Sequence, residues 1–501
     1  MADSLCFFKL ECLTPVHIGS GTTLARDFDF VIRDGKTVLL EAEQVIMQLP
    51  ALSGTNAAEM GKDLAAKIGR LLDRAGARSS ELIRQEIAGE IKADSIREAI
   101  RDGAGRPLVP GSSLKGALRT LLLAGWCGTD GPHSARQAKA GQALNTALER
   151  ARGRDDKFAA QPLEKAVFRD HFARTGADAK PGPHTDVLRT LSVADTPFAH
   201  DCLEVVSSVA LNTKSRTLTA VEALRQGAAS AVAINWGDSY VTAKLLSRAL
   251  PPLETLAEWS RRHALHLLDG DIKFLEAAGS KADALDRESQ SLQDRLQSLR
   301  ARIDRSARET IFVRLGWGAG WRTMTGDILS AQEKERLAKL GVFKETNAGA
   351  PKTRKAALDG HASEGRPANV FGWISLTAIT PGQAAALLAR AVPEPRAHAP
   401  AQPLAELPRP LELPPSAQVD PFELKLNALK PEHWGQRRQL VQEAAQTQDD
   451  TLRKKRLARL AARLTEVFGN DRKRMRELSL DPSLKPYLTR QGKQRGLNDA
   501  S

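Results

Sequence analysis

The segment VPGSSLKGALR, residues 109–119, combines the start of a helix with two basic side chains. Gly111 permits a tight turn, and either of the next two serines can cap the helix. The unpaired N–H groups of a helix N-terminus form a natural seat for a phosphate, which Lys115 and Arg119, four residues apart on one face, would extend. Two interpretations stay open, a capped helix and a phosphate-binding one. The pattern GxxxxGK[ST] is absent, which excludes a Walker A loop.

The segment LTPVHIGSG, residues 13–21, is a glycine-rich turn that follows a predicted strand. Gly19 and Gly21 would let the backbone approach a ligand closely, and His17 and Ser20 offer hydrogen bonds. An ordinary turn between a strand and a loop is the alternative interpretation.

The segment RLGWGAGWRTMTGD, residues 314–327, alternates three glycines with two tryptophans and carries an arginine on either side. Flexible backbone, stacking surfaces and guanidinium groups together suit single-stranded nucleic acid. The alternative is a turn filled by core tryptophans, since Trp is mostly buried in folded proteins. A second Gly-Trp pair occurs in FGWISL, residues 371–376.

Side chains suited to catalysis occur only as isolated candidates. His17 could serve as the general base of a metal-independent ribonuclease, although a lone histidine is more often structural or RNA-contacting. Asp27 and Asp29, in ARDFDFV, alternate with aromatic residues as in a strand with one exposed face. Asp195, in SVADT, is typical of a hydrogen-bond acceptor at the end of a strand. No catalytic residue and no metal site is therefore predicted.

The elements that must position these motifs are strands interspersed with helices. Strands are predicted at residues 4–13, 28–33, 37–40, 188–193, 202–211, 228–235, 311–315 and 371–379, with Asp34-Gly35 as the turn of a hairpin. Helices are predicted at residues 57–101, 220–226 and 240–310, the last with apolar residues near heptad spacing that indicate one arm of a helical hairpin. This distribution predicts the α+β class rather than a doubly wound sheet.

The composition indicates a basic protein of two or three domains. The 501 residues include 73 Lys and Arg against 60 Asp and Glu, a net charge of +13 that favours a polyanionic partner, either nucleic acid or an anionic membrane surface. The four cysteines have no CxxC spacing, the N-terminus has no signal-peptide pattern, and no apolar run approaches membrane-spanning length. We therefore expect a cytoplasmic protein without a cofactor.

The C-terminal part of the sequence changes character. Residues 393–420 are predicted to form a proline-rich linker without a packed core. Residues 421–501 hold 18 Lys and Arg against 10 Asp and Glu, and TLRKKRLARLAARLTEVF within them is an amphipathic helix. This basic helical tail is either a solvated appendage or a surface for RNA or a protein partner.

The ordered set of motifs resembles a known family. LTPVHIGSG, VPGSSLKGALR, LRTLSVADTPF, RLGWGAGW and FGWISL occur in this order across roughly residues 4–380. The set is similar to RAMP-superfamily subunits of type III CRISPR effectors, most of all to the fifth subunit of the type III-A Csm complex. The positions that match the family's RNA-binding segments are Gly19, Ser20, Gly21, Gly111, Ser112, Ser113, Lys115, Arg119, Gly316, Gly318 and Gly320. His17, Arg314, Trp317, Trp321 and Arg322 are added as RNA-binding candidates on their own chemistry.

The resemblance implies two ferredoxin-like (RRM-like) domains with helical insertions, at residues 1–236 and 237–392. It implies a non-catalytic, RNA-binding subunit of a ribonucleoprotein that caps the 3′ part of the CRISPR RNA (crRNA) and contributes to its maturation and to antiviral defence. The implied partners are crRNA and the other effector subunits, above all the repeated RAMP backbone subunit; target RNA is a further candidate. The alternative function is a CRISPR-repeat endoribonuclease that uses His17.

Overall fold

A computed structural model gives the architecture of the chain. It describes residues 5–49, 57–75, 79–91, 93–127, 161–170, 182–211, 218–236, 249–279, 283–324, 326–328, 354–359, 365–391, 437–468, 471–481 and 483–488, with the single positions 142, 145, 146, 149, 246, 422 and 426. The chain divides into two compact units, Met1–Arg396 and Ala397–Ser501. The predicted linker at 393–420 lies outside the described residues.

The first sheet of unit 1, sheet A, is antiparallel throughout. Its described strands run in the order β13 (Ile311–Arg314), β16 (Trp373–Ile379), β1 (Leu5–Cys12), β12 (Ala229–Trp236) and β8 (Leu191–Val193). Every second residue of β1, namely Phe8, Leu10 and Cys12, is buried. These side chains belong to one core with the apolar faces of α4 (Gly111–Cys127) and α8 (Leu253–Gly279). Strands from both sides of the predicted boundary at 236/237 thus hydrogen-bond within one sheet.

The second sheet of unit 1, sheet B, carries the glycine-rich turn. Its path is β2 (Gly19–Ala25), β6 (Ser95–Ala99), β11 (Leu218–Leu224), β10 (Leu203–Leu211), β5 (Ile83–Ala88), β4 (Lys36–Leu40) and β3 (Phe30–Arg33); β14 (Arg354–Leu358) also pairs with β10, and β15 (Pro367–Val370) with β14. A short ladder joins β7 (Leu108–Val109) to β9 (Thr196–Pro197). The predicted hairpin is confirmed: Asp34 and Gly35 turn the chain with φ of 50° and 71°. Both sheets and their helices confirm the α+β class.

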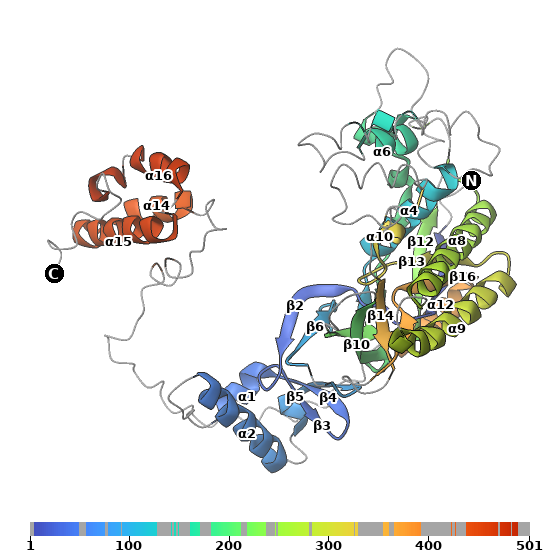
Figure 1. Ribbon diagram of the computed structural model, residues 1–501, viewed down its shortest axis with the longest axis horizontal. Coiled ribbons are helices and arrows are strands. Elements are labelled where there is room, and N and C mark those ends of the chain that lie inside the picture. The colour runs from blue at the N-terminus through green and yellow to red at the C-terminus, as the bar shows by residue number, and fades with distance from the viewer. Residues whose placement is uncertain are drawn as a thin grey trace. The chain divides into compact units, whose positions relative to one another are not determined.

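The other described helices of unit 1 are α1 (Ala42–Gln48), α2 (Ala57–Ala75), α3 (Ser79–Leu82), α6 (Gln161–Phe168), α9 (Asp283–Arg305), α10 (Trp321–Met324) and α12 (Pro381–Arg390), with 3-10 turns at Pro183–Thr185, Val187–Thr190 and His200–Cys202. Helices α8 and α9 lie side by side (Figure 1). Four buried apolar residues of α9 share a core with apolar residues of α8, which confirms the predicted helical hairpin. They are Leu292, Leu296, Leu299 and Ile303.

Two of the predicted helices are wrong in part or whole. The predicted helix at 57–101 is helical in α2 and α3, and strands β5 and β6 follow α3. The predicted short helix at 220–226 is instead strand β11, between β6 and β10. In both places apolar spacing fits a helix as well as a buried strand, and pairing with strands distant in the sequence decides the outcome.

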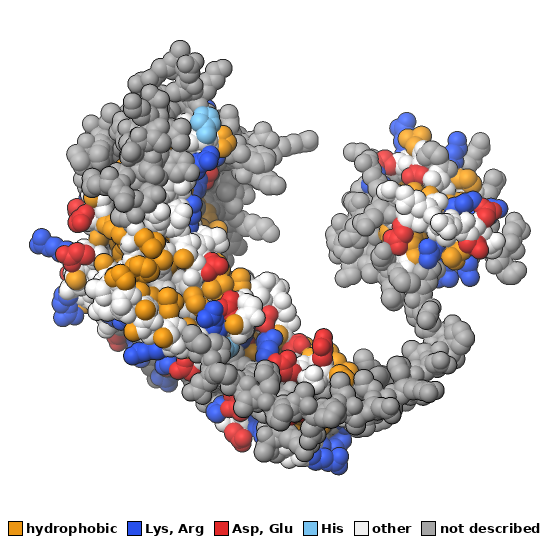
Figure 2. All heavy atoms as spheres, turned by 180° about the vertical axis from the view of Figure 1, so that it is seen from behind, with side chains coloured by type: hydrophobic (Ala, Val, Ile, Leu, Met, Phe, Trp, Pro, Cys, Tyr) orange, Lys and Arg blue, Asp and Glu red, His pale blue; other side chains and the backbone are white. Residues whose placement is uncertain are grey.

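Unit 2 is a small helical body with a core of its own. Its described helices are α14 (Arg437–Ala445), α15 (Asp450–Phe468) and α16 (Arg472–Ser479), with a 3-10 turn at Lys485–Tyr487. Leu457, Leu460 and Leu464 form a buried face of α15, as the amphipathic pattern predicts. Basic, acidic and apolar side chains are mixed on the face of this unit shown in Figure 2, whereas the same view of unit 1 includes a broad apolar area.

Candidate nucleic-acid interface

The glycine-rich turn and the Gly-Trp loop touch each other through their backbones. The Trp317 N–H donates a hydrogen bond of 2.8 Å to the carbonyl of His17. Gly316 makes this approach possible, because it has a φ of +81° and a Cβ there would lie 2.5 Å from the same carbonyl oxygen. FGWISL joins the same place, since the Gly372 N–H donates to the Pro15 carbonyl at 2.9 Å. Three motifs separated by up to 350 residues therefore meet.

A short relay of backbone hydrogen bonds connects the glycine-rich turn to the segment before α4. The Ile100 N–H donates to the Ile18 carbonyl at 2.8 Å, and the Leu108 N–H donates to the Ile100 carbonyl at 3.1 Å. Helix α10, which continues the Gly-Trp loop, contacts α4 directly. The motif VPGSSLKGALR thus lies beside the other three in one region of unit 1.

The N-terminus of α4 is capped by a carboxylate of the protein itself. The Gly111 N–H donates to Oδ1 of Asp195 at 2.7 Å, so the prediction that Asp195 is a strand-end acceptor is confirmed. Because α4 begins at Gly111, Ser112 and Ser113 lie in its first turn, and the expected serine cap is wrong. Gly111 is required here, since a Cβ would lie 2.1 Å from the Val193 carbonyl oxygen. An internal carboxylate therefore lies at the helix end where the phosphate-binding interpretation would place a phosphate.

The two cations of α4 have partners within the protein. Lys115 Nζ donates to the Leu191 carbonyl at 2.7 Å. Arg119 pairs with Glu164 at 2.9 Å and stacks on Phe168, with Cζ 4.5 Å from the ring centroid. Gly116 faces open space, so its missing side chain leaves the exposed side of α4 flat. An RNA contact by this face stays a prediction.

His17 is a buried neutral residue that supports the Gly-Trp loop. Its side chain is 2% exposed, and Nδ1 lies 2.6 Å from the Glu222 carbonyl oxygen, which assigns the proton to Nδ1. Desolvation lowers its pKa, as do the charges of Arg97 and Lys355. The ring meets the edge of Trp317, with centroids 5.8 Å apart. The other catalytic candidate, Asp27, lies in the turn between β2 and β3 with a φ of 61° and donates its N–H to the Phe30 carbonyl.

The exposed part of the glycine-rich turn forms the start of β2. Gly19, Ser20 and Gly21 are exposed, and the pairing with β6 shifts between Gly19 and Thr23. Ser20 Oγ donates to Glu98 at 3.0 Å, while Gly21 has a φ of +96° and open space around it. This edge offers accessible backbone next to the loop.

Trp317 carries two cations that sequence reasoning missed. It packs on Phe371, at a centroid distance of 5.5 Å, and beside the small apolar cluster of sheet B. Lys355 Nζ lies 3.6 Å from the Trp317 ring centroid, and Arg97 Cζ lies 5.6 Å from it. We call Arg97 and Lys355 the Trp317 cation pair. Their sequence signal is weak, because they lie singly on two strands, 258 residues apart.

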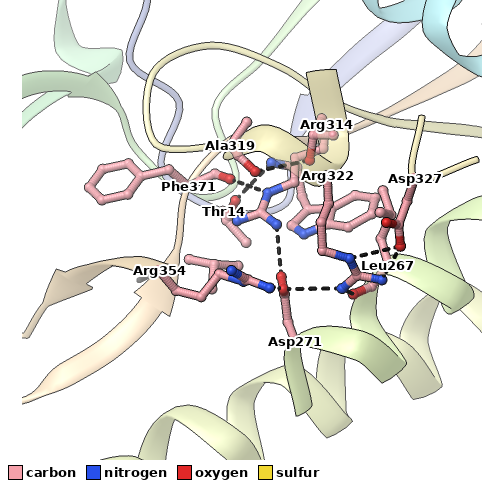
Figure 3. Close-up of polar contacts among 12 residues, drawn as sticks. Thr14, Leu267, Asp271, Arg314, Ala319, Arg322, Asp327, Arg354 and Phe371 are labelled. Carbon is pink, nitrogen blue, oxygen red and sulfur yellow. Dashed lines mark hydrogen bonds and ion pairs between the residues drawn. The ribbon is translucent and has the colours of Figure 1, made fainter. Parts of the chain in front are cut away.

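The arginines on either side of the Gly-Trp loop point away from it into a buried ion network (Figure 3). Arg314 and Arg354 pair with the two carboxylate oxygens of Asp271 at 2.8 and 3.0 Å, and Arg322 approaches Asp271 at 3.5 Å. Burial alone would raise the pKa of Asp271, but the three arginines outweigh it and hold that pKa below its ordinary value. We call these four residues the Asp271 cluster.

Arg322 also anchors the end of the loop. It pairs with Asp327 at 2.5 Å, and its guanidinium occupies the space that a side chain at position 270 would fill. Gly318 and Gly320 complete the loop with φ of 83° and 86°, and Trp321 is half-buried at the start of α10. Arg314 and Arg322 therefore hold the Gly-Trp loop from its buried side, while Gly316 and Gly320 are exposed to solvent.

The sequence that contains these motifs matches a known protein family. A family model described as the RAMP superfamily matches residues 9–321, more than half of the chain. The chain belongs to the RAMP superfamily. A search of the curated proteins finds no match.

Several solved structures are similar to this RAMP chain. One is a chain of a Csm–crRNA–target RNA ternary complex determined by cryo-EM, with 23% identity and a TM-score of 0.49, covering 75% of this chain and 100% of that chain. Another is the crystal structure of T. onnurineus Csm5, with 21% identity and a TM-score of 0.47, covering 73% of this chain and 99% of that chain.

None of the described helices of this chain combines the length and apolar character needed to cross a bilayer. The described residues contain no group of three or more His, Cys, Asp or Glu side chains placed to hold a metal ion.

Proposed function

We propose that this RAMP protein is a non-catalytic RNA-binding subunit of a type III-A (Csm) CRISPR effector, that it caps the 3′ part of the crRNA, and that it acts in crRNA maturation and antiviral defence. The observation that carries the proposal is the convergence of four motifs on one region with exposed glycine backbone, an aromatic ring and two cations that pair with no described carboxylate. Family membership and the order of the motifs support it. Its partners would be crRNA and the repeated RAMP backbone subunit.

We also propose that residues 1–236 and 237–392 derive from two ferredoxin-like halves. In the first half, the strands of sheet A and helix α4 come in the chain order β1, α4, β8, β12, that is strand, helix, strand, strand, with other elements inserted between them. Strand β12 lies between β1 and β8 in sheet A, which is the pairing that such a unit requires. In the second half, β13 and β16 extend the same sheet on the other side of β1.

Co-expression with the other effector subunits tests the assignment. The full chain should co-purify with them and with a mature crRNA, and its RNA affinity should fall steeply with salt, as phosphate contacts require. A chain that purifies alone, without RNA, would contradict the proposal.

The absence of catalysis is tested separately. Purified protein should leave CRISPR-repeat RNA intact in EDTA, because the His17 ring is buried and already bonded to Glu222. Specific cleavage that disappears in His17→Ala would establish the endoribonuclease instead.

A further inference from the structure

The Trp317 cation pair has no acidic partner among the residues that the structure describes. Neither Arg97 nor Lys355 forms an ion pair with a described Asp or Glu. The adjacent Glu98 is directed to Arg84 and Ser20 instead. Two positive charges therefore share one aromatic ring without a neutralising carboxylate.

The sheet register places both cations on one face of sheet B. Arg97 is opposite Val221 and Val221 is opposite Val206, while Lys355 is opposite Ala210. Residues opposite one another, and every second residue along a strand, share a face. Val206 and Ala210 are four residues apart on β10, so all these side chains belong to the face on which Trp317 packs.

The ring that holds the cations is fixed before any ligand arrives. The Trp317 backbone N–H donates to the His17 carbonyl. The Trp317 ring meets the rings of His17 and Phe371 edge-on, at centroid distances of 5.8 and 5.5 Å. Lys355 is half-buried, and burial together with the charge of Arg97 lowers its pKa. An anion bound between the two cations would relieve both the desolvation and the repulsion.

We infer that Arg97 and Lys355, held over Trp317, bind a phosphodiester group of RNA. The inference rests on the proposed function, which supplies the polymer. Gly19, Gly21 and Gly316 are exposed, and Gly21 has open space around it, so accessible backbone lies on the turn and the loop that adjoin the pair. The site uses the charge and position of its cations and reads no base.

The double variant Arg97→Gln/Lys355→Gln tests the site, with labelled single-stranded oligouridylate as the probe. RNA affinity should fall about tenfold and the salt slope should become shallower by about one, as the loss of one or two phosphate contacts requires. Arg390→Gln is the control for the loss of a positive charge away from the site, because Arg390 is exposed at the end of α12; it removes one charge where the double variant removes two. It should change neither quantity. Lys355→Arg keeps the charge and should retain most of the affinity.

Unchanged affinity and slope in the double variant, with clear binding by the wild type, would overturn the site and leave the proposed function standing. A wild type that binds no RNA would instead overturn the proposed function. A fall in the melting temperature of the free double variant together with unchanged affinity would show that the pair serves the fold, which also overturns the site.

Amine labelling of the wild-type protein provides a second measurement that needs no variant. An acetylating reagent followed by mass spectrometry gives the labelling rate of each lysine with and without the oligouridylate. RNA should slow the labelling of Lys355 at least severalfold more than that of Lys273, which is exposed on α8. Equal protection of the two lysines would contradict the site.

Discussion

Arg354 and Lys355 are consecutive residues of β14, yet they belong to opposite kinds of site. Arg354 pairs with the buried carboxylate of Asp271, while Lys355 lies over Trp317 without an ion pair to a described carboxylate. Successive side chains of a strand point to opposite faces, so one faces the packed helices and the other faces the Gly-Trp loop. Two adjacent cations thus differ in whether a described carboxylate neutralises their charge. In this chain, the cation that is paired with a carboxylate stabilises the fold, whereas the cation without a described carboxylate partner is available to bind a polyanion.

The largest effect is expected when the Asp271 cluster is broken. Asp271→Ala leaves buried arginines without their carboxylate, and breaking a buried pair in this way costs about 3–5 kcal/mol of unfolding free energy. Urea denaturation followed by circular dichroism measures the loss. Asp269→Ala, two residues earlier on α8, removes an exposed partner of Arg300 and should leave the midpoint nearly unchanged. Equal effects of the two substitutions would contradict the distinction between the two kinds of cation.

Acid should lower the free energy of unfolding through a buried histidine of α8. His263 on α8 donates to the Gly326 carbonyl at 3.0 Å, and burial lowers its pKa to about 4. The unfolded chain, with an ordinary pKa near 6.5, binds this proton first, so stability is lost as pH falls from about 6.5 to 4, by at most about 3 kcal/mol. Denaturation midpoints of the wild type and His263→Gln across this range check it. The variant should show a flatter profile, and parallel profiles would contradict the assignment.

Two glycines of the Gly-Trp loop, Gly316 and Gly320, have similar positive φ and can be compared by substitution. Gly316→Ala should destabilise the protein by about 2–3 kcal/mol, because the left-handed φ is unfavourable and the Cβ would strike the His17 carbonyl. Gly320→Ala has a similar φ but open space, so it should cost only about 1–2 kcal/mol. Thermal unfolding of both variants measures the difference. Equal losses would mean that the contact between loop and turn adds nothing.

The start of α4 sharpens the comparison on a smaller scale. Asp195→Ala removes the carboxylate that accepts from the Gly111 N–H and should cost about 1 kcal/mol. Chemical denaturation measures this loss. If Asp195 merely fills the seat of an RNA phosphate, the variant would bind RNA more tightly than the wild type; we expect unchanged affinity.

The smallest effect concerns the two cations of α4. Lys115 donates to a carbonyl and keeps its net charge, whereas Arg119 is neutralised by Glu164. Lys115→Gln should therefore weaken RNA binding about threefold, while Arg119→Gln should change it little. Titrations of the labelled oligouridylate at two salt concentrations distinguish them. A larger loss in Arg119→Gln would show that RNA displaces Glu164.

The sequence predicts the motifs of this region better than the role of each residue in it. Glycines that need positive φ or close approach are readable, since few other residues tolerate either. Arg314 and Arg322 were expected to contact RNA but lie beside the buried carboxylate of Asp271, which is more than 40 residues away from both in sequence and cannot be foreseen. Arg322 also pairs with the nearby Asp327. Arg97 and Lys355 were missed because only the folded sheet brings these two distant strands to the Trp317 ring.

Sheet A places the first strand of the chain between two strands made much later. Strand β1 ends at Cys12, and its neighbours β12 and β16 end at Trp236 and Ile379. A ribosome adding roughly 5–20 residues per second needs tens of seconds to reach β16 after β1 has left the exit tunnel. Both edges of β1 are unpaired until β12 emerges, and one edge stays unpaired until β16 emerges, so the apolar residues of β1 lack a complete core throughout. The newly made chain is thus most exposed to misassembly and chaperone capture before residue 379 emerges.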